Sequence, residues 1–174
     1  MNNFFSEAKN LIALSGLELK TISIGGSPQM WKAHEVPLAT EYRVGTYIYN
    51  DKSLIVAGAC TIEDCALTIL ATVISTPAPN RAVIDAGSKV LTSDLMGLEG
   101  HGLIVGYPDL TISQLSEEHG CITSNTSTNL RVGQRIQVIP NHACVVSNMV
   151  DHVVFIEDDQ VLMQKPVVAR GKVW

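Results

Sequence analysis

The segment 141–144 places an imidazole, His142, and a thiol, Cys144, two residues apart. If the strand expected over 135–139 continues past Pro140, the two side chains project from one face, because side chains alternate along a strand. Imidazole nitrogen and thiolate sulfur are preferred Zn²⁺ ligands, and two protein ligands leave coordination positions open to water or substrate. A core histidine beside a buried free cysteine is the commoner arrangement. The spacing alone leaves both interpretations open.

A second group of candidate residues follows a short strand expected over 20–24. Gly25 and Gly26 would let the backbone approach an anion, consecutive N–H groups could hold a phosphate, and Ser27 adds a hydroxyl donor. Further along the chain, Arg43 could pair with an anionic group or a ring nitrogen. The alternatives are an ordinary turn for the glycines and a solvated charge for the arginine.

Two polar clusters have residue types that could do chemistry, but we expect both to be surface features. Lys89 lies near a glycine, which could suggest a Schiff-base lysine, but a lysine in a surface turn is far commoner. Glu117, Glu118 and His119 could bind a metal or shift one another's pKa values. The simpler interpretation of these three residues is the polar end of a hairpin.

The elements that must position these residues are mostly strands. Val, Ile and Thr are abundant, and aromatic residues make up only 5% of the chain, which favours strands. Apolar residues at helical spacing over 4–14, followed by Gly16, predict one helix. The segment 66–76 could be a helix on length, but its β-branched content favours a strand. The remaining expected elements are strands over 45–49, 81–85, 102–105, 110–115, 135–139, 151–156, 160–163 and 167–173, a loop with a helical turn over 31–40, and a helical turn at the capping box 61–64.

Many short strands separated by turn residues predict a mainly β protein, with a closed or nearly closed barrel or a sandwich. The first 44 residues are different, because they contain one expected helix and one short strand. Such a pair cannot bury its apolar faces alone. We therefore interpret residues 1–44 as the end of a larger α/β unit and residues 45–174 as a β domain.

Composition narrows the class of protein. Of the 174 residues, 46% are hydrophobic and 17% are charged, which excludes a disordered chain. The net charge of −5 and the lack of a basic cluster disfavour nucleic acid and anionic membranes as partners. The longest apolar runs fall short of the roughly 20 residues that a membrane span needs. The N-terminus has no signal-peptide pattern, so we expect a cytoplasmic protein whose four cysteines are free thiols or metal ligands.

The residues of seven segments, and the order of these segments along the chain, are more specific than any single motif. They read GGSP (25–28), EYRVGTY (41–47), EDCALTILATVIS (63–75), RAVIDAGSK (81–89), LSEEHG (115–120), PNHACVVSNMVD (140–151) and VVARGKVW (167–174). In this order they resemble the D-threonine aldolase and D-serine dehydratase family, which are pyridoxal-phosphate-dependent lyases of the alanine racemase fold type. The resemblance covers essentially the whole chain.

The resemblance implies a fold and a domain organisation. Members of this family have an N-terminal (β/α)₈ barrel that holds the cofactor, followed by a C-terminal β domain. Residues 1–44 are then a remnant of the last barrel elements, and residues 45–174 are the C-terminal β-barrel or sandwich with a metal site. The family's cofactor lysine belongs to the first part of the barrel, and no lysine of this chain lies in a matching motif. The resemblance therefore implies half of a lyase that is inactive alone.

The resemblance also assigns residues. His142 and Cys144 match the family's metal pair, which binds a divalent ion beside the substrate; a cysteine there favours Zn²⁺ over Mn²⁺, because thiolate is a soft ligand. The cofactor-binding residues that it implies are Gly25, Gly26, Ser27, Arg43, Gly45 and Thr46. No catalytic residue is assigned.

The reaction implied is a lyase reaction on a D-3-hydroxy amino acid. It is either retro-aldol cleavage to glycine and an aldehyde or elimination of water, and the sequence does not decide between them. We expect a homodimer or other homo-oligomer, or association with a missing N-terminal barrel. The alternative is a non-catalytic metal-binding or interaction module derived from the same family.

Overall fold

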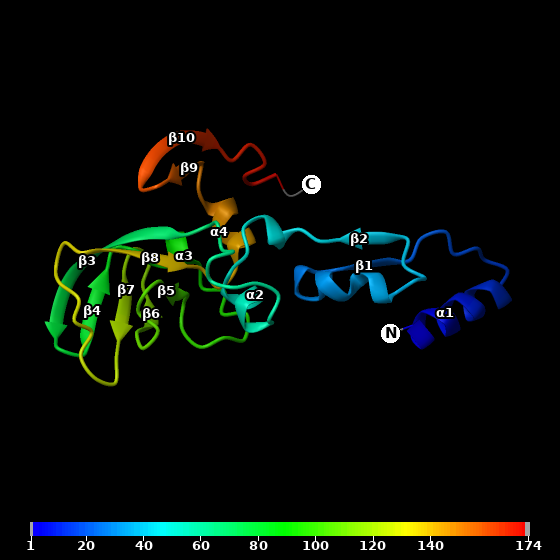
Figure 1. Ribbon diagram of the computed structural model, residues 1–174, viewed down its shortest axis with the longest axis horizontal. Helices are drawn as coiled ribbons and strands as arrows, with labels where there is room; N and C mark the ends of the chain where they lie inside the picture. Colours follow the sequence, from blue (N-terminus) through cyan, green and yellow to red (C-terminus); the bar gives the residue numbers. More distant parts are fainter. Residues whose placement is uncertain (1, 173–174) are drawn as a thin grey trace.

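The computed structural model describes residues 2–172. Within this range the strands form one sheet of six and two sheets of two. The six-stranded sheet curls into a barrel, the N-terminal segment extends away from it, and a hairpin near the C-terminus stands over it (Figure 1). The protein is mainly β, as the sequence predicts.

The barrel is an antiparallel sheet with the strand order β5-β8-β3-β4-β7-β6. Its two end strands approach each other, because the backbone N–H of His101, just before β5, donates to the Ile112 carbonyl of β6 at 3.0 Å. This contact nearly closes the sheet and leaves it with little free edge. The strands are β3 (Ile69–Ala78), β4 (Arg81–Ile84), β5 (Leu103–Ile104), β6 (Thr111–Leu115), β7 (Gly120–Thr123) and β8 (Arg135–Ile139).

Side chains of alternate residues fill the barrel interior. Val73, Ile84, Ile112, Ile122 and Val138 are all 0% exposed. Most of their neighbours along the strands are more exposed, which is the period-two pattern of a half-buried strand, although Ile139 beside Val138 is only 1% exposed. The interpretation of 66–76 as a strand is therefore confirmed by β3, and the expected strands near 81–85, 102–105, 110–115 and 135–139 are confirmed as well.

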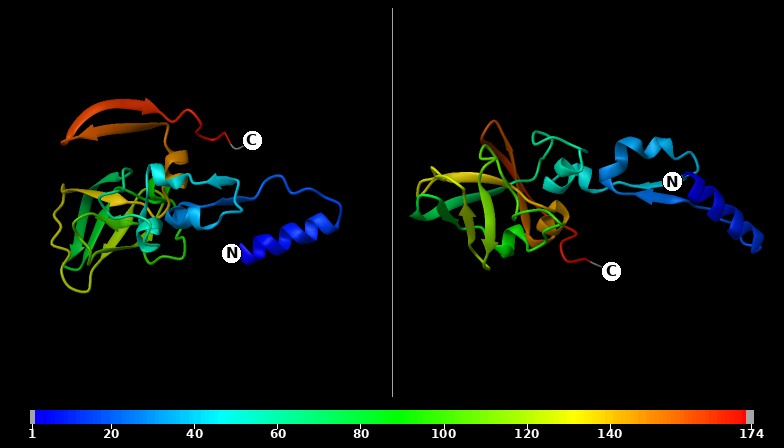
Figure 2. Two further views of the ribbon diagram at one scale, coloured as in Figure 1. Left: turned by 45° about the vertical axis from the view of Figure 1, so that its right-hand side comes forward. Right: turned by 90° about the horizontal axis from the view of Figure 1, so that it is seen from below.

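The N-terminal segment begins with α1 (Asn2–Leu14), which confirms the expected helix. It continues through β1 (Ser23–Gly25) and the 3₁₀ helix η1 (Ser27–Glu35) to β2 (Glu41–Arg43), and β1 and β2 pair in parallel. A side chain at Gly25 would place its Cβ 2.8 Å from that of Arg43, so the close pairing of the two strands requires glycine there. Figure 2 shows this segment extending beyond the barrel in both further views.

The strand expected over 45–49 is wrong. These residues form the 3₁₀ helix η2 (Thr46–Ile48), because the Thr46 carbonyl accepts hydrogen bonds from the N–H groups of Tyr49 at 3.0 Å and Asn50 at 2.8 Å. The expected helical turn at 61–64 is only a turn. It is closed by the Asp64 carboxylate, which accepts from the N–H and the hydroxyl of Thr61 at 2.8 and 3.0 Å.

Three short α-helices flank the barrel and were not predicted. They are α2 (Lys52–Val56), α3 (Ser88–Leu91) and α4 (Ala143–Met149). Asp51 ties two of them together. Its Oδ1 accepts from the N–H of Leu54 at 3.1 Å, and its Oδ2 accepts from the N–H of Ala143 at 2.9 Å. One buried carboxylate therefore caps both α2 and α4.

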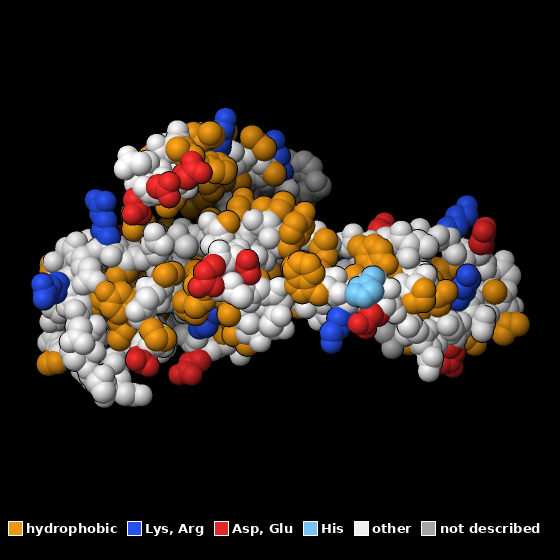
Figure 3. All heavy atoms as spheres, viewed as in Figure 1, with side chains coloured by type: hydrophobic (Ala, Val, Ile, Leu, Met, Phe, Trp, Pro, Cys, Tyr) orange, Lys and Arg blue, Asp and Glu red, His pale blue; other side chains and the backbone are white. Residues whose placement is uncertain are grey.

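The C-terminal strands β9 (His152–Glu157) and β10 (Gln160–Pro166) pair with each other and with no other strand of the described chain. Their apolar side chains are largely exposed, with Val161 at 70% and Phe155 at 49%. Figure 3 shows hydrophobic side chains on the surface of this hairpin. The further strand expected over 167–173 is wrong for 167–172, which form turns, and residue 173 lies outside the described residues.

Candidate metal and ligand site

His142 and Cys144 lie at the start of a helix, not on a strand. Strand β8 ends at Ile139, His142 is the N-cap residue of α4, and Cys144 lies in the first turn of that helix. The expectation that both side chains project from one face of a continuing strand is therefore wrong. The physical reason is Asp51, whose carboxylate caps the N–H of Ala143 and turns the chain into a helix after Pro140.

The His142 ring contacts a carboxylate. Its Nδ1 lies 2.9 Å from Oδ2 of Asp94, and the two side chains are 25% and 38% exposed. The other carboxylate oxygen, Oδ1, accepts the N–H of Met96 at 3.2 Å. The hydrogen bond to His142, followed by that from Met96, holds the pKa of Asp94 below its usual value, so the carboxyl group is ionised near neutral pH.

The Cys144 sulfur is exposed and contacts a hydroxyl. The distance between Sγ and Oγ1 of Thr46 is 3.2 Å, and the two residues are 98 positions apart in the chain. This contact joins η2 to α4. It also brings together a residue expected to bind metal and a residue expected to bind the cofactor.

All four cysteines are free thiols. Cys60 and Cys65 contact each other in the loop after α2. Burial, followed by the neighbouring thiol, raises the pKa of Cys65 to about 12. Cys144 differs from this pair because it is exposed.

Asn141 braces the loop that carries Asp94. It is only 2% exposed, its Oδ1 accepts from the N–H of Gly102 at 3.0 Å, and its Nδ2 donates to the carbonyls of Asp94 at 3.3 Å and Gly100 at 2.8 Å. Asp94, Asn141 and Asp51 were missed by the sequence analysis. For Asp51 there was a signal, since it lies three residues before the apolar residues that begin at Leu54, and aspartate is a typical helix N-cap.

The residues expected to bind the cofactor lie on or directly beside β1, η1, β2 and η2, and most of their side-chain contacts are with residues outside the expected set. The Nε of Arg43 donates to the Ser23 hydroxyl at 2.9 Å. Ser27 is 2% exposed, and its hydroxyl accepts from the N–H of Tyr47 at 3.1 Å. Gly26 has a φ of 107° and its N–H donates to the Arg43 carbonyl at 3.3 Å. Gly45 precedes η2, and a Cβ on it would meet no atom within 4 Å.

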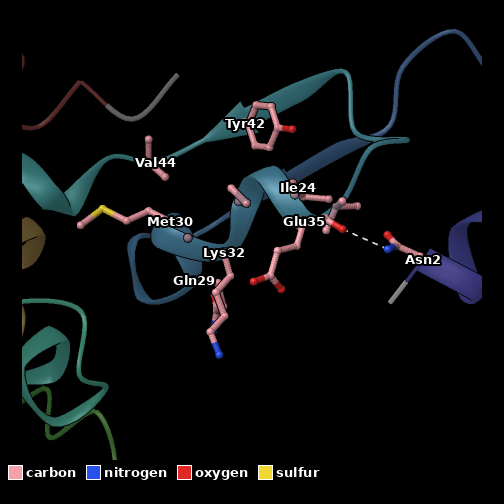
Figure 4. A pocket seen from close by; sticks show the side chains of 12 residues that line it. Asn2, Ile24, Gln29, Met30, Lys32, Glu35, Tyr42 and Val44 are labelled. Atoms are coloured by element: carbon pink, nitrogen blue, oxygen red, sulfur yellow. Dashed lines mark hydrogen bonds between the residues drawn. The ribbon is translucent and has the colours of Figure 1, made fainter.

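Gly25 and Gly26 also line a groove of about 340 Å³ between η1 and β2. Figure 4 shows Ile24, Met30, Tyr42 and Val44 around this groove, which makes its walls largely apolar. Ser27 is buried beside the N–H of Tyr47, and Arg43 contacts Ser23 through its Nε. The assignment of the six residues to the cofactor stays a prediction.

The chemistry of His142 and Cys144 suits a divalent metal ion. The Nδ1 of His142 faces a carboxylate, which leaves Nε2 for a metal, and this is the usual arrangement of a metal-binding histidine. Cys144 supplies an accessible sulfur two residues later. Within residues 2–172, no group of three or more His, Cys, Asp or Glu side chains is arranged to hold a metal ion. A metal bound here would take two ligands from this part of the chain.

The two surface clusters are not part of this arrangement. Lys89, which lies in α3, forms an ion pair with Glu118 at 2.8 Å, and both side chains are more than 60% exposed. This ion pair raises the pKa of Lys89 and lowers that of Glu118. A lysine held protonated on the surface is not suited to forming a Schiff base.

Residues 66–156 match a protein family described as "Putative serine dehydratase domain". An uncharacterised protein of Mycobacterium tuberculosis is 38% identical over 129 residues, which cover 71% of this chain and 97% of that protein. The chain belongs to this serine dehydratase domain family. The predicted resemblance is thereby confirmed.

Solved structures show the same fold. D-threonine aldolase from Filomicrobium marinum superposes with a TM-score of 0.81 at 24% identity, over 99% of this chain and 47% of that chain. D-threo-3-hydroxyaspartate dehydratase from Delftia sp. HT23 gives a TM-score of 0.77 at 26% identity, over 92% and 47%. An alanine-racemase-like protein of Idiomarina loihiensis gives 0.74 at 23% identity, over 92% and 47%. The predicted alanine-racemase-like β domain is confirmed, and this chain spans about half the length of these proteins.

Within the described residues, no helix is both long enough and apolar enough to cross a lipid bilayer.

Proposed function

We propose that this chain is the metal-binding C-terminal half of a lyase that acts on D-3-hydroxy amino acids. The observation that carries the proposal is the His142–Asp94 contact of 2.9 Å at the start of α4, in a chain that belongs to the serine dehydratase domain family. We place the boundary between the barrel remnant and the β domain at residues 44 and 45, between β2 and η2.

In this proposal Nε2 of His142 and Sγ of Cys144 hold a divalent ion, with Zn²⁺ favoured over Mn²⁺ because of the thiolate. When bound, the ion supplies Lewis-acid stabilisation of negative charge on the 3-hydroxyl oxygen of the substrate. Asp94 keeps the His142 ring in the tautomer with the proton on Nδ1. Two protein ligands leave room for a substrate to approach the ion.

The activity of the intact enzyme is either elimination of water or retro-aldol cleavage. The structural relatives include one enzyme of each kind, so the fold supports neither over the other. The resemblance places the cofactor lysine in the first part of the barrel, and no lysine of this chain lies in a matching motif. We therefore propose that the chain is inactive alone and that the cofactor is held by an N-terminal barrel.

Metal content tests the first part of this proposal. After incubation with Zn²⁺ and extensive dialysis, elemental analysis should find about one zinc per wild-type chain. His142→Ala and Cys144→Ala should each lose it, whereas the matched controls His119→Ala and Cys121→Ala should keep it. Zinc retained by both site variants would contradict the proposed ligands.

Turnover tests the second part. The chain is mixed with pyridoxal phosphate, Zn²⁺ and D-threonine, D-serine or D-threo-3-hydroxyaspartate, and the products glycine, aldehyde, keto acid and ammonia are assayed. We expect no product. Turnover by the isolated chain would refute the proposal that it is half of an enzyme, and the products would show which reaction it performs.

The second candidate is a non-catalytic metal-binding or interaction module of the same family. The exposed apolar hairpin β9–β10 favours an association, because large uncovered apolar surfaces tend to bind partners. We propose a homo-oligomer or a complex with a barrel-bearing chain, in the cytoplasm, where the four cysteines stay reduced. Sedimentation at increasing concentration should show self-association, and a monomer at every concentration would argue against the homo-oligomer.

A further inference from the structure

We infer that Asp94 and Thr46 are the positioning residues of the proposed metal site, the first for the His142 ring and the second for the Cys144 sulfur. This inference rests on the proposed function, because it assigns roles to residues around the proposed ligands. Neither residue is close in sequence to the ligand that it contacts, since they are 48 and 98 positions away.

The Asp94 contact fixes the histidine. A neutral imidazole carries one proton, and a carboxylate that faces Nδ1 holds the proton there. The lone pair of Nε2 is then free to bind a metal, and the negative charge makes that nitrogen a stronger ligand. Asp94 cannot rotate freely, because its second oxygen accepts the N–H of Met96 at 3.2 Å.

Asn141 makes the Asp94 contact rigid. This buried residue directly precedes His142, and its side-chain amide donates to the carbonyl of Asp94 itself. It also bonds Gly100 and Gly102 of the same loop. Both sides of the His142–Asp94 contact are therefore attached to one residue, His142 through the backbone and Asp94 through the side-chain amide, so movement of the loop away from the ring would leave buried polar groups unpaired.

The Thr46 contact acts on the other ligand. Oγ1 of Thr46 lies 3.2 Å from Sγ of Cys144, and the threonine hydroxyl can donate a hydrogen bond along this contact. Such a bond fixes the direction of the sulfur and withdraws negative charge from it. Asp51 holds the backbone between the two ligands, since its carboxylate accepts from the N–H of Ala143.

Cobalt titration tests the inference, because Co²⁺ reports on geometry through its visible absorption and on sulfur through its charge-transfer band in the near ultraviolet. The chain, loaded with Co²⁺ alone, is compared with Asp94→Asn, Thr46→Val and Thr46→Ser. Asp94→Asn should weaken cobalt binding about 10- to 100-fold. Thr46→Val should shift the charge-transfer band, and Thr46→Ser, which keeps the hydroxyl, should restore the wild-type band.

The outcomes separate this inference from the proposed function. If the wild-type chain shows no charge-transfer band with Co²⁺, the proposed metal site fails. If the wild type binds but Asp94→Asn and Thr46→Val match its affinity and spectrum, the positioning roles are overturned and the site stands. Asp109→Asn, which removes an exposed carboxylate without a hydrogen-bond partner in the described chain, is the matched control for charge. Thr46→Val is nearly isosteric, so it keeps the test valid if Asp94→Asn unfolds.

Discussion

The barrel and the β9–β10 hairpin are both antiparallel, but the apolar side chains in the barrel interior are buried and those of the hairpin are largely exposed. In the barrel the end strands β5 and β6 meet, so each strand has one face turned to a shared interior. Within residues 2–172 no third strand pairs with the hairpin, and Val154, Ile156 and Leu162 are all more than 50% exposed. A two-stranded ribbon has no interior of its own. We infer that the closed barrel contributes more to the free energy of unfolding than the hairpin does, although both are rich in apolar residues.

The largest expected effect comes from replacing one isoleucine in each region and comparing the two changes in stability. Ile122→Ala in the barrel should lower the free energy of unfolding by about 2–5 kcal/mol, because Ile122 is 0% exposed and its removal leaves a cavity. Ile156→Ala in the hairpin, where the residue is 54% exposed, should change it by less than about 0.5 kcal/mol. Urea denaturation followed by circular dichroism measures both. Equal losses would show that the hairpin is covered in solution.

The next test pairs two aspartates. Asp51→Asn should cost about 2–3 kcal/mol, because one buried carboxylate accepts from both Leu54 and Ala143 and an amide cannot replace both acceptor oxygens. Asp159→Asn, at the exposed tip of the hairpin, should be close to neutral. The same denaturation experiment compares them, and a neutral Asp51→Asn would show that the carboxylate does not hold α2 and α4 together.

The rate of alkylation can be compared between a half-buried thiol, Cys65, and an exposed thiol, Cys144. Alkylation needs the thiolate, and a pKa of about 12 gives Cys65 a thiolate fraction roughly 1,000-fold below that of an ordinary cysteine at neutral pH. With iodoacetamide at pH 7.5, peptide mapping should find exposed Cys144 modified first and Cys65 last. Modification of Cys65 before Cys144 in the folded chain would contradict the raised pKa of the half-buried Cys65.

The smallest expected effect is a change in how the free energy of unfolding depends on pH. Burial, and then the charge of Lys52, lower the pKa of His101 below its ordinary 6.5. The unfolded chain then binds more protons than the folded chain, so stability should fall as pH drops through 6.5 towards the lower folded pKa. Comparing the free energy of unfolding at pH 8, 7, 6 and 5, His101→Gln should flatten this slope. His152→Gln on the hairpin is the matched control, and an equal flattening by both variants would rule out burial of His101 as the cause.

Local patterns predicted much of the barrel. Strands β4, β6 and β8 follow from β-branched segments between turn residues, and α1 from apolar spacing that ends at Gly16. The predictions failed where a distant contact decides the local conformation. The chain after β8 becomes a helix because of Asp51, which lies 92 residues before Ala143. No periodicity in 140–144 contains that information.

The candidate site shows the same limit. The ligand pair His142 and Cys144 was predicted from residue types and from the resemblance, and it stays a prediction. Asp94 could not be predicted, because nothing in its neighbourhood points to His142, 48 residues later. The six expected cofactor residues were predicted as a set, but the structure pairs Arg43 with Ser23 and Ser27 with Tyr47. Sequence spacing identifies residue types that could do chemistry and leaves open which of them meet.

The strand order β5-β8-β3 has a consequence for the motions available to α4. Because β8 is bonded on both sides, the backbone that leads into the helix is held by two neighbouring ladders, although the helix itself lies at the surface. Unfolding that begins at the hairpin should therefore stop before β8. The amide proton of Ala143, which is bonded to the Asp51 carboxylate at 2.9 Å, should exchange with solvent more slowly than the amide protons of the hairpin.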